Sequence, residues 1–224
     1  MCFSSSFSFG ASAVLGVTGI ASMAYSRTLP QRVLSGIPII FAIQQFTEGI
    51  LWLALMHSEW AHWGKAATYL FLVFAQVIWP VYVPLSMLLF EREPARKRMM
   101  AALAAAGFMF SIYLSYCLFS SPVSAAIDSH HIRYELGFSL AKKWYYGLLY
   151  FIPTIIAPVI SSIKRLHWIG YLFLASYILA RLLFHFYVIS VWCFFGAWIS
   201  IIVLWIIVRL NNDRKKHAYG AISN

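Results

Sequence analysis

The side chains best suited to chemistry in this sequence lie in one apolar stretch, where a carboxylate stands among two amides and an indole. Gln44, Glu48 and Trp52 follow one another at four-residue steps, and Gln45 precedes Glu48 by three residues. On a helix these four side chains share one face. A charged group near the middle of a bilayer costs about 2.5 kcal/mol or more, so a glutamate there normally faces a partner or water. This face is therefore the candidate site.

The composition places the chain in the membrane class. Of 224 residues, 62% are hydrophobic and 11% are charged, whereas soluble domains carry about 25% charged residues. The net charge of +10 does not indicate a nucleic-acid partner, because the basic residues occupy short gaps between apolar runs, where they act as topology signals. The bilayer itself is the first partner that the sequence predicts.

A membrane span needs about 20 apolar residues, and the apolar runs predict an all-α membrane protein, a seven-transmembrane helix bundle. One domain covers 1–210, followed by a basic cytoplasmic tail at 211–224. We interpret the first run as a retained span and not as a cleaved signal peptide. The predicted spans are 5–25, 33–57, 66–90, 98–119, 143–162, 166–186 and 189–208.

The basic residues predict the orientation, because Lys and Arg in short loops collect on the cytoplasmic side. Most of them fall in the first, third and fifth connections and in the tail. The N-terminus is therefore expected outside and the C-terminus in the cytoplasm. The residues predicted to be cytoplasmic are Arg27, Arg32, Arg92, Arg96, Lys97, Arg98, Lys164, Arg165, Arg209, Arg214, Lys215 and Lys216.

One connection, 120–142, is long enough to be a lid or a binding loop. It carries His130, His131 and Tyr134, and we expect a short strand or an interfacial lid on the outer side. Adjacent histidines can bind a metal or carry protons. Neighbours on a strand point to opposite faces, so only one of the two would face a cavity, and we favour His131.

Arg181 lies inside the sixth predicted span, in its outer half. It belongs either to the same outward-facing cavity as Glu48 or to a buried ion pair with Glu48 that only fixes helix register. All three cysteines are also predicted on the outer side. Cys2 and Cys193 could form a disulfide, bind copper or zinc with histidines, or be small buried apolar residues, with Cys117 as the third thiol. The candidate metal ligands are His130, His131, His185, Cys2 and Cys193.

Several segments together resemble an uncharacterised family of bacterial seven-span integral membrane proteins. They are Met1–Ser5, the Gln44-Gln45 to Glu48-Gly49 stretch, 130–134, the Ser161-Ser162 pair and the Ser190–Phe195 run. The resemblance covers almost the whole chain and implies a location in the bacterial inner membrane, but it implies no activity. The positions that match the family's signature are Cys2, Gln44, Gln45, Glu48, His131, Tyr134, Ser162, Trp192 and Cys193.

Three functions fit these residues, and we favour the first. It is a polytopic membrane protein that binds or transports a small molecule, a lipid or an ion in an outward-facing polar cavity. The absence of an internal repeat weakens a comparison with inverted-repeat transporters. The ligand-binding residues would be Gln44, Gln45, Glu48, Trp52, Tyr134, Arg181 and Trp192.

The second is a metal-dependent membrane hydrolase or transferase acting on a lipid. Zinc would lower the pKa of bound water to about 7, with Glu48 or His131 as general base. The third is a metal or thiol redox protein on the outer face, using Cys2 and Cys193. The sequence has no Walker loop and no glycine-rich dinucleotide motif, so nucleotide chemistry is not expected.

Overall fold

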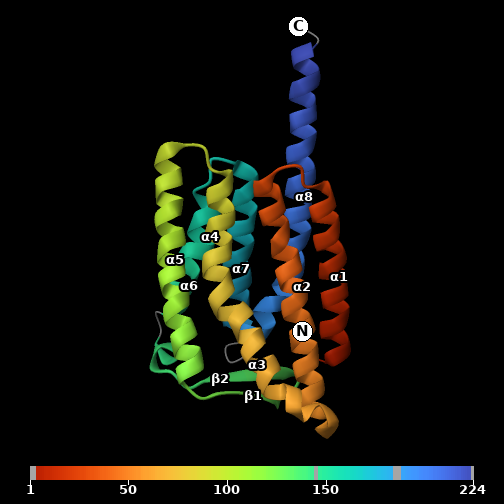
Figure 1. Cartoon of the computed structure of the whole chain (residues 1–224), viewed down its shortest axis with the longest axis vertical. Helices are drawn as coiled ribbons and strands as arrows, with labels where there is room; N and C mark the ends of the chain where they lie inside the picture. The colour runs from red at the N-terminus through yellow and green to blue at the C-terminus, as the bar shows by residue number, and fades with distance from the viewer. Residues whose placement is uncertain (1–3, 144–145, 184–187, 223–224) are drawn as a thin grey trace.

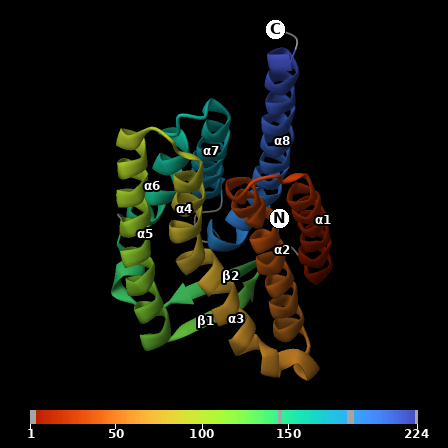
Figure 2. The ribbon, with the colours of Figure 1, turned by 45° about the horizontal axis from the view of Figure 1, so that its top comes forward.

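A computed structural model describes residues 4–143, 146–183 and 188–222, with the backbone alone at 142, 148, 188, 190–194 and 214–222. Long helices run side by side along the long axis, and a small β-hairpin lies across one end (Figure 1). The end of α8 projects from the opposite end, as Figures 1 and 2 both show. The fold is therefore an α-helical bundle with a two-stranded addition.

The first two helices form an antiparallel pair. Helix α1, Ser5–Tyr25, begins at Ser4, whose side chain accepts a hydrogen bond from the Phe7 N–H at 3.2 Å. Helix α2, Leu29–Met56, has a proline in its first turn, where the missing N–H costs nothing. A Cβ on Gly49 would lie 2.7 Å from the Phe9 ring, so glycine is what lets α1 approach α2 at that depth.

The third rod of the bundle changes its helical type along its length. It starts with the 3₁₀ segment η1, Ser58–Trp63, and continues as α3, Gly64–Leu72. A π-helical segment, η2, Val73–Ile78, then leads into α4, Trp79–Phe90. Pro80 and Pro84 have no N–H to donate, which breaks the ordinary ladder of backbone hydrogen bonds here.

Helix α5, Pro94–Ser120, packs against α4. Pro84 cannot donate to the Pro80 carbonyl, which instead faces Gly107 so closely that a side chain there would collide with it. The hairpin follows, with β1, Val123–Asp128, antiparallel to β2, His131–Leu136. Its turn contains Ser129, at φ 57°. The loop predicted to hold one strand thus holds two, followed by the 3₁₀ turn η3, Ser139–Lys142.

The last part of the chain is helical again. Helix α6, Tyr146–Val159, is joined through η4, Lys164–Leu166, to α7, His167–Leu183. Helix α8, Val188–Ile222, then passes the expected domain boundary at residue 210 without a break. Asn211 is buried there, accepts from Gln31 Nε2 at 3.0 Å and donates to the Tyr25 carbonyl at 2.6 Å.

Among the described residues, six helical segments are long and apolar enough to cross a membrane. They fall in α1, α2, the η1–α4 rod, α5, η4–α7 and α8, and the apolar helix α6 is shorter. Large apolar side chains such as Val17, Met109 and Leu182 are exposed on the outside of the bundle, as expected where lipid replaces water. The membrane class is confirmed in this sense, while seven crossings stay a prediction.

Candidate functional site

The polar face predicted on α2 is buried inside the bundle. Gln44 and Glu48 are 0% exposed, Gln45 is 1% exposed and Trp52 is 3% exposed. All four side chains are enclosed by the bundle, so they do not face lipid. Buried polar groups need hydrogen-bond partners, and the arrangement of those partners describes the site.

Two hydrogen bonds organise this face. Gln45 Nε2 donates to Glu48 Oε2 at 3.0 Å, which turns the amide nitrogen toward the carboxylate. Trp79 Nε1, from α4, donates to Gln44 Oε1 at 3.0 Å. The Trp79 ring also stacks on Phe41 of α2, with centroids 4.1 Å apart. Sequence analysis did not identify Trp79 as part of the site, because the contact between α4 and α2 is evident only in the folded structure.

Two buried polar atoms on this face have no hydrogen-bond partner within the described part of the chain. They are Gln45 Oε1, an acceptor, and Trp52 Nε1, a donor. Ser8 Oγ on α1 is a third, next to Phe9, which packs on Gly49 of α2. An unsatisfied buried polar group costs about 1–3 kcal/mol. Two of these three atoms, Gln45 Oε1 and Trp52 Nε1, lie on the Glu48 face of α2.

The π-helical segment η2 contacts α2 and brings further polar groups near this level. Its Gln76 is 7% exposed and accepts a hydrogen bond from the Tyr146 hydroxyl. In a π-helix the Ala75 carbonyl would accept from residue 80, which is proline, and the Tyr150 hydroxyl donates to it at 2.7 Å. π-Helical segments occur frequently at functional sites, and this one faces the Glu48 helix.

The hairpin covers the end of the bundle next to this site. Ile132 and Tyr134 of β2 pack in one apolar cluster with Trp52 of α2 and Phe71 of α3. The Tyr134 ring lies parallel to the Phe71 ring, with centroids 4.8 Å apart. Tyr134 and Trp52, predicted from sequence to share a site, are therefore brought into the same cluster.

The two adjacent histidines separate as strand geometry predicts. His130 is exposed in the hairpin turn, whereas His131 is 9% exposed. Burial lowers the pKa of His131 below its ordinary value, and the neighbouring His130 acts in the same direction. The His131 imidazole is therefore neutral at pH 7, the form that accepts a proton or binds a metal.

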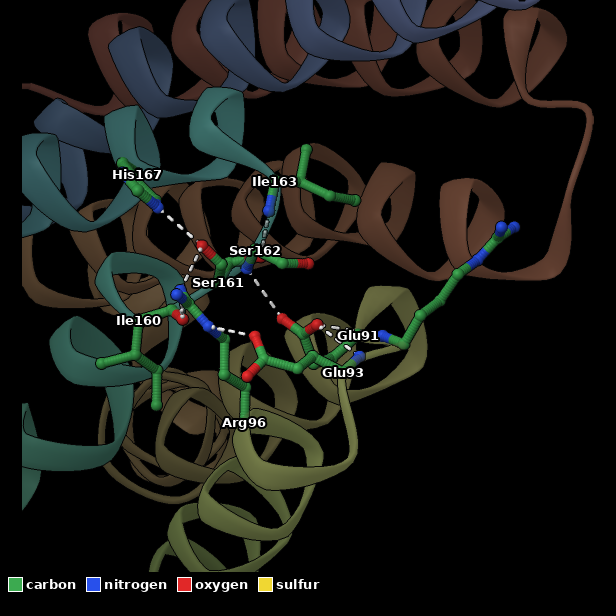
Figure 3. Close-up of polar contacts among 9 residues, drawn as sticks. Glu91, Glu93, Arg96, Ile160, Ser161, Ser162, Ile163 and His167 are labelled. Atoms are coloured by element: carbon green, nitrogen blue, oxygen red, sulfur yellow. Dashed lines mark hydrogen bonds and ion pairs between the residues drawn. The ribbon is translucent and has the colours of Figure 1, made fainter.

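A second buried carboxylate lies at the opposite end of the bundle, and sequence reasoning missed it (Figure 3). Glu91 follows α4 and is 3% exposed. Its Oε1 accepts from the backbone N–H groups of Arg92 and Glu93, both at 3.0 Å, and its Oε2 accepts from Ser162 at 2.8 Å. Burial alone would raise the pKa of Glu91, but these hydrogen bonds outweigh burial and lower it.

Further hydrogen bonds in this region join the α4–α5 connection to the α6–α7 connection. Arg96 pairs with Glu93 at 2.6 Å and donates to the carbonyls of Ile160 and Ser161 at 2.9 and 3.3 Å. The His167 Nε2 lies 2.7 Å from the Ser161 carbonyl oxygen. The Ser161 carbonyl therefore takes part in a structural junction between the two connections.

The sequence matches the family of unknown function DUF6629 over residues 1–218. The chain belongs to this family. The resemblance inferred from the sequence is thereby confirmed at the level of an uncharacterised family, and its bacterial origin stays a prediction. No curated protein and no solved structure matches the chain.

Arg181 of this DUF6629 protein does not join Glu48. The Arg181 side chain is exposed on α7 whereas Glu48 is fully enclosed. Both residues lie in the described part of the chain, and no ion pair connects them. The buried ion pair considered from the sequence is therefore wrong, because the Arg181 face of α7 turns away from the interior.

Several predicted ligands of the DUF6629 protein lie outside the described residues. Cys2 and His185 are among them, and for Trp192 and Cys193 the backbone of α8 is described without the side chains. In the described part of the chain, no three His, Cys, Asp or Glu side chains come together as metal ligands. Cys117 is buried on α5. The zinc or copper site stays a prediction.

Proposed function

We propose that this protein is a multi-pass membrane protein that binds or transports a small polar ligand or an ion at the Glu48 face of α2. The observation that carries the proposal is the pair of unsatisfied buried atoms, Gln45 Oε1 and Trp52 Nε1, on the same face as the Glu48 carboxylate. A purely structural polar cluster would bond these atoms internally, because leaving each unsatisfied costs about 1–3 kcal/mol.

The chemistry of these atoms defines what the ligand must offer. A donor or a cation on the ligand satisfies Gln45 Oε1 and adds to the neutralisation of Glu48, and an acceptor satisfies Trp52 Nε1. A carboxylate at membrane depth is neutral or is balanced by a positive charge. A proton, a small cation or an amphipathic ammonium compound therefore fits the face better than an anion.

The proposed topology brings this site close to the outer surface. With α6 as a seventh crossing, the two termini lie on opposite sides of the membrane. The α1–α2, α4–α5 and α6–α7 connections and the end of α8 lie together at one end of the bundle (Figure 1), and they carry most of the basic residues. The positive-inside rule then makes that end cytoplasmic and the hairpin end external. The expected location is the bacterial inner membrane.

A protease-protection assay tests this orientation. A C-terminal tag on the full chain is expected to resist protease added to intact cells and to be cleaved after lysis. Cleavage without lysis would reverse the orientation and would place the Glu48 site near the cytoplasmic surface.

Ion-dependent thermal stabilisation of the purified protein tests the binding function. The probes are NaCl, KCl and tetramethylammonium chloride, each against an equal concentration of N-methylglucamine chloride, together with a pH series. We expect one cation or proton binding to raise the unfolding temperature of the wild type and Glu48→Gln to abolish that rise. The matched control is Glu59→Gln, which removes an exposed carboxylate of η1 at the same end of the bundle.

Two outcomes would count against the binding site. An identical response of wild type and Glu48→Gln to every probe would show that Glu48 takes no part in binding. Loss of folded protein in Glu48→Gln, with normal Glu59→Gln, would instead assign Glu48 to the architecture. The metal-dependent alternatives predict bound zinc or copper in protein purified without chelator, which elemental analysis measures.

A further inference from the structure

An apolar groove runs between α4 and α5 on the outer surface of the bundle, away from the Glu48 site. Its volume is about 350 Å³, and its lining includes Leu85 of α4 and Phe108 and Ile112 of α5. These three side chains are 41%, 54% and 52% exposed. Both helices belong to segments apolar and long enough to cross the membrane, so the groove opens to the hydrocarbon of the bilayer.

The polar groups in the lining are already satisfied by the protein. The Tyr82 hydroxyl donates to the Val33 carbonyl at 2.6 Å. Ser111 Oγ donates to the Val77 carbonyl at 2.7 Å, and Ser115 Oγ donates to the Ser111 carbonyl at 2.8 Å. The groove therefore offers a ligand almost only hydrocarbon contacts, which match an alkyl chain and not a polar solute.

Unpaired positive charge lies at the end of the groove next to the α4–α5 connection. Arg92, Lys97 and Arg98 are exposed, and none of them has an ion-pair partner among the described residues. Arg96, by contrast, is occupied by Glu93 and by two backbone carbonyls. Clusters of Lys and Arg next to a membrane span attract anionic lipid head groups.

The charges and the groove are aligned along α5. Lys97 precedes Phe108 by eleven residues, which on a helix returns the side chain to within about 20° of the same direction. Leu85 lies five residues before the end of α4, about 8 Å along the helix, and Val77 lies about 12 Å deeper. On α5 the lining continues to Ser115, about 27 Å from Lys97, so the groove reaches past the middle of the roughly 30 Å hydrocarbon core.

We propose that the α4–α5 groove and the adjacent basic residues form a binding site for one anionic phospholipid. One acyl chain lies in the groove against Leu85, Phe108 and Ile112, and the phosphate lies near Lys97, with Arg92 and Arg98 adding positive charge. The close approach of Gly107 to the Pro80 carbonyl fixes α5 against α4 beside the groove. This site is independent of the Glu48 site, so failure of either proposal leaves the other standing.

Native mass spectrometry of the full-length protein tests the acyl-chain part. The probes are phosphatidylglycerol and phosphatidylcholine with identical palmitoyl and oleoyl chains, added to the detergent-purified protein. Leu85→Trp and Ile112→Trp each fill the groove and are expected to lower retention of bound phosphatidylglycerol about tenfold. The control is Met109→Trp, because Met109 is 67% exposed on α5 and does not line the groove.

A charge variant tests the head-group part. Lys97→Gln is expected to weaken phosphatidylglycerol binding about fivefold, since one Lys near a membrane surface contributes about that much, and to leave phosphatidylcholine unchanged. The matched control is Lys164→Gln, which removes an exposed charge from the α6–α7 connection at the same end of the bundle.

Three results would overturn the lipid site. The first is equal lipid retention in the groove-filling variants and in Met109→Trp. The second is an equal preference for phosphatidylglycerol in Lys97→Gln and Lys164→Gln. The third is a dimer of the wild type that the groove-filling variants dissociate while their lipid retention stays unchanged. The last result would make a second copy of the chain the occupant. Monodisperse elution of each variant in size-exclusion chromatography verifies that it is folded.

Discussion

The two buried glutamates of this protein, Glu48 and Glu91, lie at opposite ends of the bundle and differ in what surrounds them. Glu91 accepts three hydrogen bonds from backbone N–H groups that come from two connections. Glu48 is bonded by the amide of Gln45, and the same helix face carries Gln45 Oε1 and Trp52 Nε1 without partners in the described chain. One neighbourhood is complete, and the other leaves an acceptor and a donor unused.

This difference in bonding distinguishes a glutamate with a structural role from one in a candidate binding site. Backbone N–H groups converging on a carboxylate fix two loops in one arrangement. Side-chain atoms enclosed without partners carry a continuing cost, which a folded protein tolerates most readily where a ligand removes it. Burial alone does not distinguish the two glutamates, because Glu48 is 0% exposed and Glu91 is 3% exposed.

The same substitution at the two glutamates gives the largest contrast in stability. Glu91→Gln turns one of its two acceptor atoms into a donor that faces backbone N–H groups, so we expect the free energy of unfolding to fall by about 3 kcal/mol. Glu48→Gln keeps one side-chain oxygen, which can still accept from Gln45 Nε2, and we expect a smaller loss of about 1 kcal/mol. Reversible unfolding in mixed detergent micelles measures both.

The control for this contrast is Glu93→Gln, because the Glu93–Arg96 pair is about half exposed, with side chains 49% and 43% accessible. Its loss should stay below about 1 kcal/mol. Equal losses at positions 48 and 91 would remove the distinction between the two neighbourhoods.

The acid dependence of stability sharpens the assignment of Glu91. Its pKa in the folded protein is lowered below the ordinary value of 4.5, so its contribution is fully present above that value and is lost as the pH falls through the folded pKa. We expect the stability difference between wild type and Glu91→Gln to be about 3 kcal/mol and constant from about pH 5 to 7. Below about pH 4.5 this difference should shrink. A difference that grows on acidification would contradict the lowered pKa.

Trp52→Phe tests whether the unused indole donor serves a ligand. The change removes Trp52 Nε1, whose burial without a partner is costly, while it leaves a small void, and the two effects nearly offset each other. Stability should therefore change by less than about 1 kcal/mol. A hydrated cation offers a water oxygen that accepts from the Trp52 N–H, so the cation response of the purified protein should weaken about tenfold. Trp79→Phe is the companion variant, because it removes a donor that is already bonded to Gln44 and should mainly destabilise.

The smallest expected effect is at Ser8, whose buried hydroxyl has no partner in the described chain. Ser8→Ala removes a polar atom at no cost in bonds, so the free energy of unfolding should stay level or rise by about 1 kcal/mol. Ser35→Ala is the contrasting variant, because Ser35 Oγ bonds Ser26 Oγ at 2.7 Å and the Gln31 carbonyl at 2.9 Å. This change should lower the free energy of unfolding by about 1 kcal/mol. Destabilisation by Ser8→Ala would indicate that the hydroxyl is satisfied by bound water or a ligand.

Hydropathy and loop length were sufficient to predict most helix positions. The span expected at 5–25 is α1, Ser5–Tyr25, and that expected at 33–57 lies within α2, Leu29–Met56, apart from its last residue. The polar face of α2 was also predictable, because a carboxylate and amides at helical spacing in an apolar run have few structural explanations. The C-terminal end of α8 could not be predicted in this way. Charged residues after position 208 end the apolar run, but the helix continues through them.

The rotation of each helix and the long-range partners could not be predicted. A helix that is apolar on all sides has no hydrophobic stripe to orient it, so nothing in the sequence showed that Arg181 faces outward. The bond from Trp79 to Gln44 joins residues 35 positions apart. The π-helical segment depends on the tertiary partners that satisfy its carbonyls, and Glu91 resembled one more charge in a basic loop.

Helix α8 is held against the bundle at two depths, which decides how a force on its projecting end reaches the interior. Gly196 approaches the Phe41 ring so closely that a Cβ would lie 2.6 Å from it, and Phe41 stacks on Trp79, which bonds Gln44. Nearer the other end, Asn211 bonds Gln31 and the Tyr25 carbonyl, and about 17 Å of helix continues from there to Ile222. A force on the projecting end therefore acts first on the Asn211 contacts and only then on the ring beside the polar face.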